Sequence, residues 1–270
     1  MNPNKALWEK GDFTAIAAFM RQSGEALVES LGITPQIRVL DVGCGDGTTA
    51  LPLARLGADV LGVDIARNLV DAGNKRAASA GLERLRFQEG DACSLEGIAD
   101  DSFDLTLSMF GVMFAPKPFD VARELVRVTK PGGRIVMANW IPNDPTFVSQ
   151  VLKISSAFTP PPPEGFVSPM TWGVESPIVE RFGQAGVPAE KISTLRDTYS
   201  FLSPDVGPEG FIDVFRRFYG PSMNAFEAAE KNGRGEELHG QLLELARREN
   251  TAGLGSLSIA ATFMRVTVSL

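Results

Sequence analysis

The stretch VLDVGCGDG, residues 39–47, decides the fold of this chain. The apolar run that ends at Val42 is typical of a buried parallel strand, and a helical pattern opens directly afterwards at Thr48 or Thr49. The three glycines between them allow a sharp turn and leave the main chain open to a ligand. Such a turn predicts a ligand crevice at the carboxyl edge of a parallel sheet.

Strands and helices alternate on both sides of this turn. Short apolar runs predict buried strands at Ile37–Val42, Asp59–Asp64, Leu85–Glu89, Phe103–Met109 and Gly133–Asn139. Helical patterns between them cover Thr48–Leu56, Arg67–Ala80, Ser94–Ala99 and Pro118–Thr129. This alternation predicts right-handed strand–helix–strand units, and therefore an α/β fold with a doubly wound, Rossmann-like sheet.

The flanking segments add helices and two more strands. Apolar residues at helical spacing predict one helix over Phe13–Leu31. Later helices are predicted at Thr146–Phe158, Pro177–Ala185, Pro208–Ala229 and Gly235–Asn250, and strands at Lys191–Leu202 and Leu257–Val268. The last strand is apolar on both faces, which predicts a place between other strands.

Composition and charge narrow the classes of function. The 26 Lys and Arg residues against 33 Asp and Glu give a net charge of −7, without a basic block, so nucleic-acid binding is not expected. The chain has no signal-peptide core and no apolar run of membrane length, which predicts a cytoplasmic protein that does not act at a membrane. Cys44 and Cys93 match no metal spacing, so they are expected to be reduced and no metal is predicted.

The spacing of the glycines separates two classes of cofactor. A dinucleotide fingerprint, G-x-G-x-x-G, that began at Gly43 would have its third glycine at position 48, where the chain has Thr48. The glycines fall instead at positions 43, 45 and 47. The D-x-G-x-G-x-G pattern that starts at Asp41 resembles motif I of the class I S-adenosylmethionine-dependent methyltransferases.

Later features keep register with this motif. Asp64 ends the second strand, where a carboxylate can accept both hydroxyls of a ribose. Asp91 follows the third strand, and the resemblance implies that it accepts from the adenine amino group. Ser108 ends the fourth strand, and the resemblance implies that the main chain around it holds the methionine part. Phe110 and Phe114 would then lie beside the sulfonium.

The resemblance covers residues 39–137 in the right order. A weaker resemblance extends to Leu7–Asp12 and to Pro160–Pro163 with Trp172. These segments look like features of small-molecule methyltransferases of the ubiquinone-biosynthesis-like group. The candidates for cofactor binding are Asp41, Gly43, Cys44, Gly45, Asp64, Ile65, Asp91, Ala92, Ser108 and Phe110. The candidates for the substrate pocket are Trp8, Phe114, Trp140, Trp172 and Tyr219.

The resemblance also implies an architecture and a reaction. It implies a sheet of about seven mostly parallel strands with the last one antiparallel, plus helical lid elements. We expect one methyltransferase domain over 1–270, with N-terminal lid helices at 1–32, a cofactor-binding core at 33–140, and a substrate-side half at 141–270 that contains a helical insert at 205–250. The implied reaction is methyl transfer from S-adenosylmethionine to a small organic acceptor, by O-, C- or N-methylation, with S-adenosylhomocysteine as product.

Several alternatives stay open at this point. They are a methyltransferase that acts on protein or RNA, a protein that binds S-adenosylmethionine without catalysis, an aminopropyl transferase and an NAD-dependent dehydrogenase. The catalytic residues are unknown, because no local motif selects a general base. The possible bases are His239, which is the only histidine, and Asp12, Tyr199, Asp213 and Tyr219. The expected partner is a small-molecule substrate, and the expected state is a monomer or homodimer.

Overall fold

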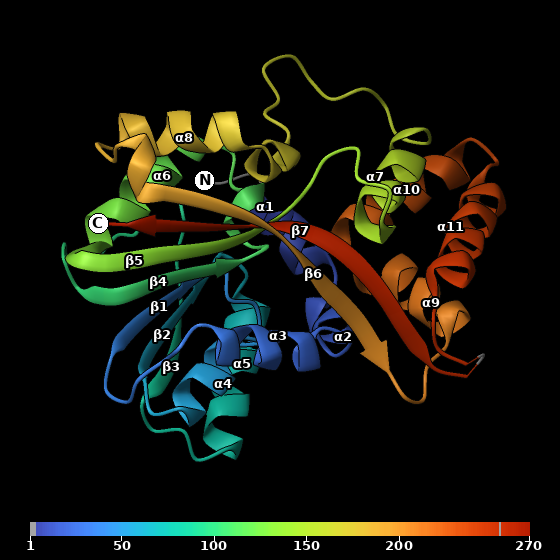
Figure 1. The fold of residues 1–270 in the computed structure, drawn as a ribbon. Coiled ribbons are helices and arrows are strands. Elements are labelled where there is room, and N and C mark those ends of the chain that lie inside the picture. Colours follow the sequence, from blue (N-terminus) through green and yellow to red (C-terminus); the bar gives the residue numbers. More distant parts are fainter. Residues whose placement is uncertain (1–3, 254) are drawn as a thin grey trace.

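The computed structural model describes residues 4–253 and 255–270 (Figure 1). The strands are β1 (Arg38–Val42), β2 (Asp59–Asp64), β3 (Leu85–Glu89), β4 (Phe103–Met109), β5 (Thr129–Trp140), β6 (Ile192–Ser203) and β7 (Leu257–Ser269). The helices are α1 (Asn4–Lys10), α2 (Phe13–Ala17), α3 (Arg21–Ser30), α4 (Ala50–Arg55), α5 (Arg67–Ser79), α6 (Pro118–Val128), α7 (Phe147–Ser156), α8 (Glu175–Gln184), α9 (Pro208–Phe218), α10 (Gly220–Lys231) and α11 (Gly235–Glu249). Short 3-10 turns lie at η1 (Val112–Phe114), η2 (Pro169–Gly173) and η3 (Ala189–Lys191).

One seven-stranded sheet organises the molecule, in the order β3-β2-β1-β4-β5-β7-β6. The pairs β1–β2, β1–β4, β2–β3 and β4–β5 are parallel, and β7 runs antiparallel to both β5 and β6. The predicted doubly wound sheet with an antiparallel last strand is therefore confirmed. The strand order reverses between β1 and β4, so the ligand crevice is expected at the carboxyl ends of these two strands.

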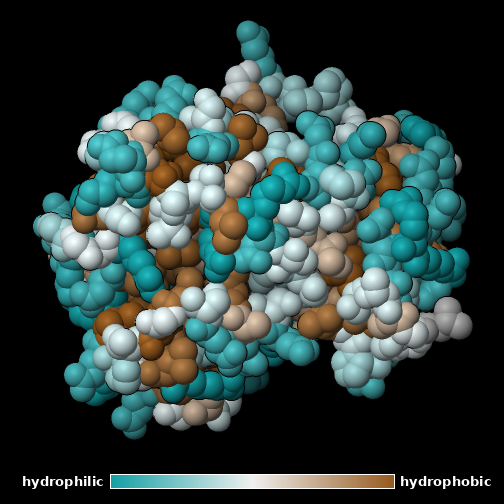
Figure 2. All heavy atoms as spheres, in the orientation of Figure 1, coloured by the Kyte–Doolittle hydropathy of each residue, from teal (hydrophilic) through white to brown (hydrophobic). Residues whose placement is uncertain are grey.

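Helices cover both faces of the sheet (Figure 1). α6 and α8 lie on one face, whereas α3, α4 and α5 lie on the other, and α7, α9, α10 and α11 gather beyond the long ends of β6 and β7. Hydrophobic surface is more abundant over the half that contains the sheet than over the helical half (Figure 2). Within the described ranges, no helix has the length and apolar character that a membrane span requires.

The predicted helix Phe13–Leu31 is wrong as one continuous element, because the structure has α2 and α3 with a turn between them. The carbonyl of Phe19 accepts the N–H of Leu202 from β6, at 2.8 Å. In an unbroken helix this carbonyl would accept the N–H of the residue four positions later in its own chain. The contact with β6 therefore draws the backbone out of helical conformation.

The predicted helix Ser94–Ala99 is also wrong, since this segment has an isolated bridge at Ser94 and a short turn but no helix. Side chains of α6 satisfy the backbone groups that a helix would pair internally. The Leu95 N–H donates to the Glu124 carboxylate at 2.6 Å, and the Arg127 guanidinium donates to the carbonyls of Leu95 and Ile98. Tertiary hydrogen bonds thus replace local ones.

The predicted helix Pro208–Ala229 is divided into α9 and α10 at Tyr219. Pro221 has no N–H to continue the hydrogen-bond ladder. A Cβ added to Gly220 would lie 2.4 Å from the Leu7 carbonyl oxygen, so the break also lets α1 approach closely. It places Tyr219 beside the N-terminal helices.

Candidate active site

The glycine loop occupies the crevice between β1 and β4. Gly43, Gly45 and Gly47 have φ values of 68°, 56° and 89°, in the left-handed region that glycine enters without strain. A Cβ added to Gly111 would lie 2.5 Å from the Gly43 carbonyl oxygen, so the loops after β1 and β4 are in close contact. A Cβ on Gly45 would meet only the Phe13 ring, at 3.8 Å. Gly45 therefore faces open space.

Asp41 lies at the base of this loop and is 1% exposed. Its Oδ2 accepts the Thr49 hydroxyl at 2.6 Å, whereas its Oδ1 has no partner among the residues that the structure describes. Burial raises the pKa of Asp41 to about 7. A buried carboxylate oxygen without a donor is unfavourable by itself, so the position suits a cationic ligand.

Asp64 connects the end of β2 to the loop. One carboxylate oxygen accepts the N–H of Gly45 at 2.8 Å, and the other accepts the N–H of Ala66 at 2.9 Å. Burial raises the pKa of Asp64. A hydrogen bond from the Ile65 backbone also favours the ionised form, and because a carboxylate can accept about four hydrogen bonds, the group retains capacity for a further donor.

Two arginines anchor the loop through a residue that sequence reasoning missed. Asp46 is 2% exposed, and its Oδ2 pairs with Arg21 of α3 at 2.9 Å and with Arg76 of α5 at 3.1 Å. Arg76 also donates to the Asp46 carbonyl at 2.7 Å. No motif in the sequence links Asp46 to these arginines, since they come from other helices.

Cys44 contributes its backbone to this packing. Its N–H and that of Gly43 both donate to the Val63 carbonyl, at 3.2 and 2.7 Å. Its thiol is buried, and a Cβ added to Gly62 would lie 2.9 Å from the sulfur. Burial raises the pKa of the Cys44 thiol, so the side chain is neutral at ordinary pH.

A cavity of about 370 Å³ lies at the carboxyl ends of β2 and β3. Its lining consists of Lys5, Ile65, Arg67, Glu89, Gly90 and Asp91. The cavity brings together the predicted residues Ile65 and Asp91, and adds Lys5 from α1, which the sequence did not indicate. The hydrogen bonds from Lys5 and Arg67 lower the pKa of Glu89. The neighbouring Ala92 is half-buried against the core.

Ser108 ties the end of β4 to that of β1. Its hydroxyl donates to the Val42 carbonyl at 2.7 Å and accepts the Val112 N–H at 3.1 Å. Phe110 follows with φ of 62°, an uncommon conformation for a non-glycine residue. Its buried ring stacks on Trp140, with centroids 3.7 Å apart and an interplanar angle of 5°. Both rings belong to the packed core.

Three of the predicted pocket residues meet above the glycine loop. The Trp8 ring lies 5.0 Å from Phe114 and 6.0 Å from Tyr219, measured between centroids. Phe13, which sequence reasoning missed, lies 5.9 Å from Trp8. We call Trp8, Phe13, Phe114 and Tyr219 the aromatic cluster. Its members come from α1, α2, η1 and the break between α9 and α10.

Trp172 lies elsewhere. It is 1% exposed in η2 and packs edge-on against Phe182 at 6.2 Å, below the Arg181 guanidinium. It therefore lies outside the aromatic cluster.

The candidate general bases are dispersed. His239 on α11 lies 3.4 Å from Asp213 on α9. The Tyr199 hydroxyl donates to the Met20 carbonyl, and burial raises its pKa, as it does that of Tyr219. Asp12 accepts from the Thr14 N–H at the start of α2. The described part of the chain contains no group of three His, Cys, Asp or Glu side chains that could hold a metal ion.

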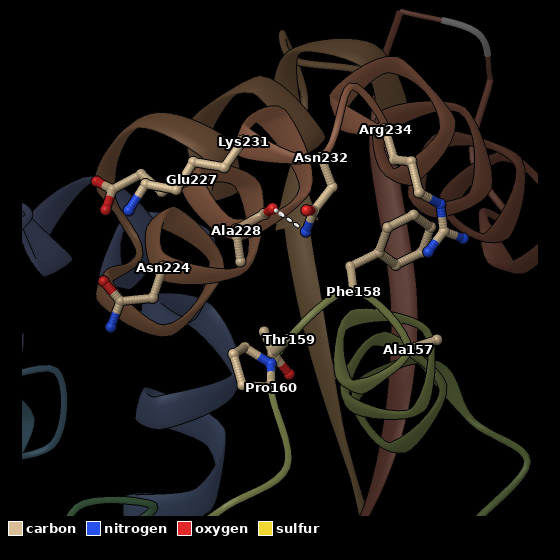
Figure 3. Close-up of a pocket in the computed structure, with 10 residues that line it drawn as sticks. All are labelled: Ala157, Phe158, Thr159, Pro160, Asn224, Glu227, Ala228, Lys231, Asn232 and Arg234. Carbon is tan, nitrogen blue, oxygen red and sulfur yellow. Dashed lines mark hydrogen bonds between the residues drawn. The ribbon is translucent and has the colours of Figure 1, made fainter.

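A second cavity of about 560 Å³ lies between α7, α10 and α11 (Figure 3). In its wall the Arg234 guanidinium lies over the Phe158 ring at 4.2 Å, and Asn232 donates to the Ala228 carbonyl at 2.9 Å. None of the residues predicted for the site lines this cavity.

The chain is similar in sequence to known methyltransferases. Residues 40–137 match a family described as a methyltransferase domain. An uncharacterised protein of Mycobacterium tuberculosis is 34% identical over 253 residues, which are 93% of this chain and 89% of that protein. The methyltransferase GfsG of Streptomyces halstedii is 42% identical over 119 residues, 43% of this chain and 42% of the relative.

A solved structure shares the fold. It is phosphoethanolamine N-methyltransferase 2 of Haemonchus contortus, in complex with phosphomonomethylethanolamine and S-adenosylhomocysteine. The TM-score is 0.56 at 17% identity, and the match covers 92% of this chain and 52% of that one.

Proposed function

The chain belongs to the class I S-adenosylmethionine-dependent methyltransferases, and from this membership we propose that it methylates a small organic acceptor at the glycine loop. The observation that carries the proposal is the buried Oδ1 of Asp41, which has no partner among the described residues. The ammonium group of the cofactor's methionine part would give this oxygen a charged donor. A tight turn without a ligand would not need such an acceptor.

The cavity at the carboxyl ends of β2 and β3 supports a place for the adenosine part. Asp64 would accept from the ribose hydroxyls, because its carboxylate retains capacity for a further donor. Asp91 would accept from the adenine amino group, and Ile65 would cover the ring from the side. Ala92 would offer its backbone N–H to the ring, and the backbone around Ser108 would hold the methionine end.

The aromatic cluster supports a place for the reacting groups. When bound, S-adenosylmethionine supplies a methyl group on a sulfonium, whose C–S bond breaks with both electrons left on sulfur as the acceptor's lone pair forms the new bond. The faces of Trp8 and Phe114 would attract the sulfonium cation. Closure by Phe13 and Tyr219 would exclude water and orient a small apolar or aromatic acceptor.

The chain's charges and hydroxyls limit the mechanism further. A net charge of −7 supports a small acceptor over a nucleic acid. Burial raises the pKa of Tyr219, so its hydroxyl stays protonated at neutral pH and does not serve as a base. We therefore assign binding, orientation and exclusion of water to the aromatic cluster, and no general base.

A transfer screen tests the proposal. Tritiated S-adenosylmethionine is incubated with phenols, quinols, carboxylic acids and amines, and radioactivity in the acceptor is measured. We expect transfer to one class, with kcat/KM reduced in Trp8→Ala and unchanged in Phe166→Ala, which removes a ring that is 54% exposed outside the aromatic cluster. Tight binding of S-adenosylhomocysteine without transfer to any class would contradict the proposal.

A further inference from the structure

Near the end of β5, a positive charge is buried without a salt-bridge partner among the described residues. Arg181, on the inner side of α8, is 4% exposed. Its Nη2 donates to the Thr171 hydroxyl at 2.6 Å, and its Nη1 has no partner in the described ranges. The negative charge of the preceding residue, Glu180, acts to raise the pKa of Arg181, but the two side chains form no salt bridge. Arginine stays protonated even when buried, so the charge is not removed by titration.

A second unsatisfied donor lies against this arginine. The Arg181 guanidinium lies over the Trp172 ring, 4.4 Å from its centroid. Trp172 is 1% exposed, and no described residue accepts from its Nε1–H. Two donors of one stacked pair are therefore buried without acceptors, which native proteins rarely tolerate unless a ligand or water satisfies them.

Asn139 supplies a third polar group on the same side of the sheet. Its neighbour Trp140 packs against Tyr199, whose hydroxyl reaches Met20 on the α3 side. Successive side chains of a strand point to opposite faces, so Asn139 points to the face that α6 and α8 cover (Figure 1). Asn139 is 1% exposed, and neither atom of its amide has a partner in the part of the chain described.

A chain of contacts connects Trp172 to the aromatic cluster. η2, which contains Trp172, packs on the end of β5, because a Cβ added to Gly173 would lie 2.0 Å from the Trp140 carbonyl oxygen. η1 contacts η2, and η1 carries Phe114 of the aromatic cluster. The stacked pair of Arg181 and Trp172 is therefore connected to the aromatic cluster through η2 and η1.

We propose that Arg181 and Trp172 bind a carboxylate of the acceptor, so that the substrate is a small carboxylic acid. This inference rests on the proposed methyl transfer. The free Nη1 of a planar guanidinium and the indole N–H are directional donors that suit a carboxylate, and the positive charge selects the ionised acid over a neutral analogue. The acid group is bound for recognition, and Arg181 determines specificity.

Calorimetry on the protein saturated with S-adenosylhomocysteine tests this inference. The probes are benzoate and octanoate, each compared with its neutral amide, benzamide or octanamide. We expect at least one acid to bind about tenfold more tightly than its amide. The preference should vanish in Arg181→Met and weaken in Trp172→Phe, which keeps the ring and removes the N–H. Arg84→Met removes an exposed arginine and is the charge-matched control that should keep it.

The outcomes separate this inference from the proposed function. Equal affinity for acids and amides, or a preference that survives Arg181→Met, would overturn the acid site. Weaker binding of S-adenosylhomocysteine to Arg181→Met would assign the arginine to the cofactor and would also overturn it. Failure of the wild-type protein to bind S-adenosylhomocysteine would instead contradict the proposed function, and the acids would then be titrated into the protein alone. Thermal unfolding of Arg181→Met should show no decrease in Tm, because the variant removes an unpaired buried charge.

Discussion

At the scale of one residue, burial makes the contribution of Asp41 to stability depend on pH. Burial raises its pKa from the ordinary value of 3.8 to about 7, so the folded protein favours the neutral form. The resulting stability is present below about pH 4 and is lost as the pH rises through about 7. Asp41→Asn removes this dependence. We expect the variant to unfold at a higher Tm than the wild type near pH 8, and to approach it near pH 5.

The same residue predicts the pH dependence of binding. An ammonium group beside Oδ1 prefers the ionised carboxylate, so the affinity of the wild type for S-adenosylhomocysteine should rise as the pH increases through about 7. Asp41→Asn should bind weakly at every pH. Calorimetry between about pH 5 and 8 measures both curves, and parallel curves for the two proteins would exclude Asp41 from the cofactor site.

Gly45 and Gly81 form a matched pair for testing the loop. Both have positive φ, 56° and 65°, and an added Cβ has no contact closer than 3.8 Å at either position. Valine at either site should cost roughly 1–2 kcal/mol of stability through backbone strain. Only Gly45→Val should also reduce the affinity for S-adenosylhomocysteine. Similar affinities in the two variants, at similar Tm, would mean that Gly45 does not face the cofactor.

The sequence predicted some residues of the site and missed others. The glycine spacing and the acids at strand ends follow from local pattern, so Asp41 and Asp64 were identifiable as candidates. Asp46 and Phe13 were not, because their partners come from distant helices. Phe110 was expected beside the sulfonium, whereas its ring packs against Trp140 in the core.

At the scale of elements, α1 connects the two halves of the site. Lys5 pairs with Glu89 at the end of β3, and Lys10 pairs with Glu227 of α10 at 2.6 Å. Lys5→Met should speed the release of S-adenosylhomocysteine about two- to fivefold, as expected for a surface ion pair. Lys75→Met, an exposed control on α5, should not.

Stopped-flow measurement of the release rate checks this prediction. Added salt should speed the release from the wild type and have less effect on Lys5→Met, because it screens the same ion pair. Equal rates in all three proteins would show that α1 does not restrain the cofactor.

The elements themselves were predicted well where local pattern decides them. The strands β1, β2 and β4 follow from mostly buried apolar runs, as expected of strands covered on both faces. The errors lie where distant contacts override local propensity. The turns after Asp91 depend on Glu124 and Arg127, and the break after α2 depends on β6.

At the scale of the whole molecule, the sheet order places the site. The parallel pairing of β1, β2 and β3 brings the glycine loop, Asp64 and Asp91 to one edge, although Gly43 and Asp91 lie 48 positions apart. Strand–helix alternation was enough to predict this edge. The parts that would contact the acceptor come from both ends of the chain, and only the folded structure brings them together.

Calorimetry with S-adenosylhomocysteine and NAD decides between a methyltransferase site and a dinucleotide site. We expect the wild-type protein to bind S-adenosylhomocysteine with a Kd in about the micromolar range. We also expect that Asp64→Ala and Gly45→Val lose this binding, and that NAD does not compete. Preferential binding of NAD, or undiminished binding of S-adenosylhomocysteine by both variants, would contradict a methyltransferase site at the glycine loop.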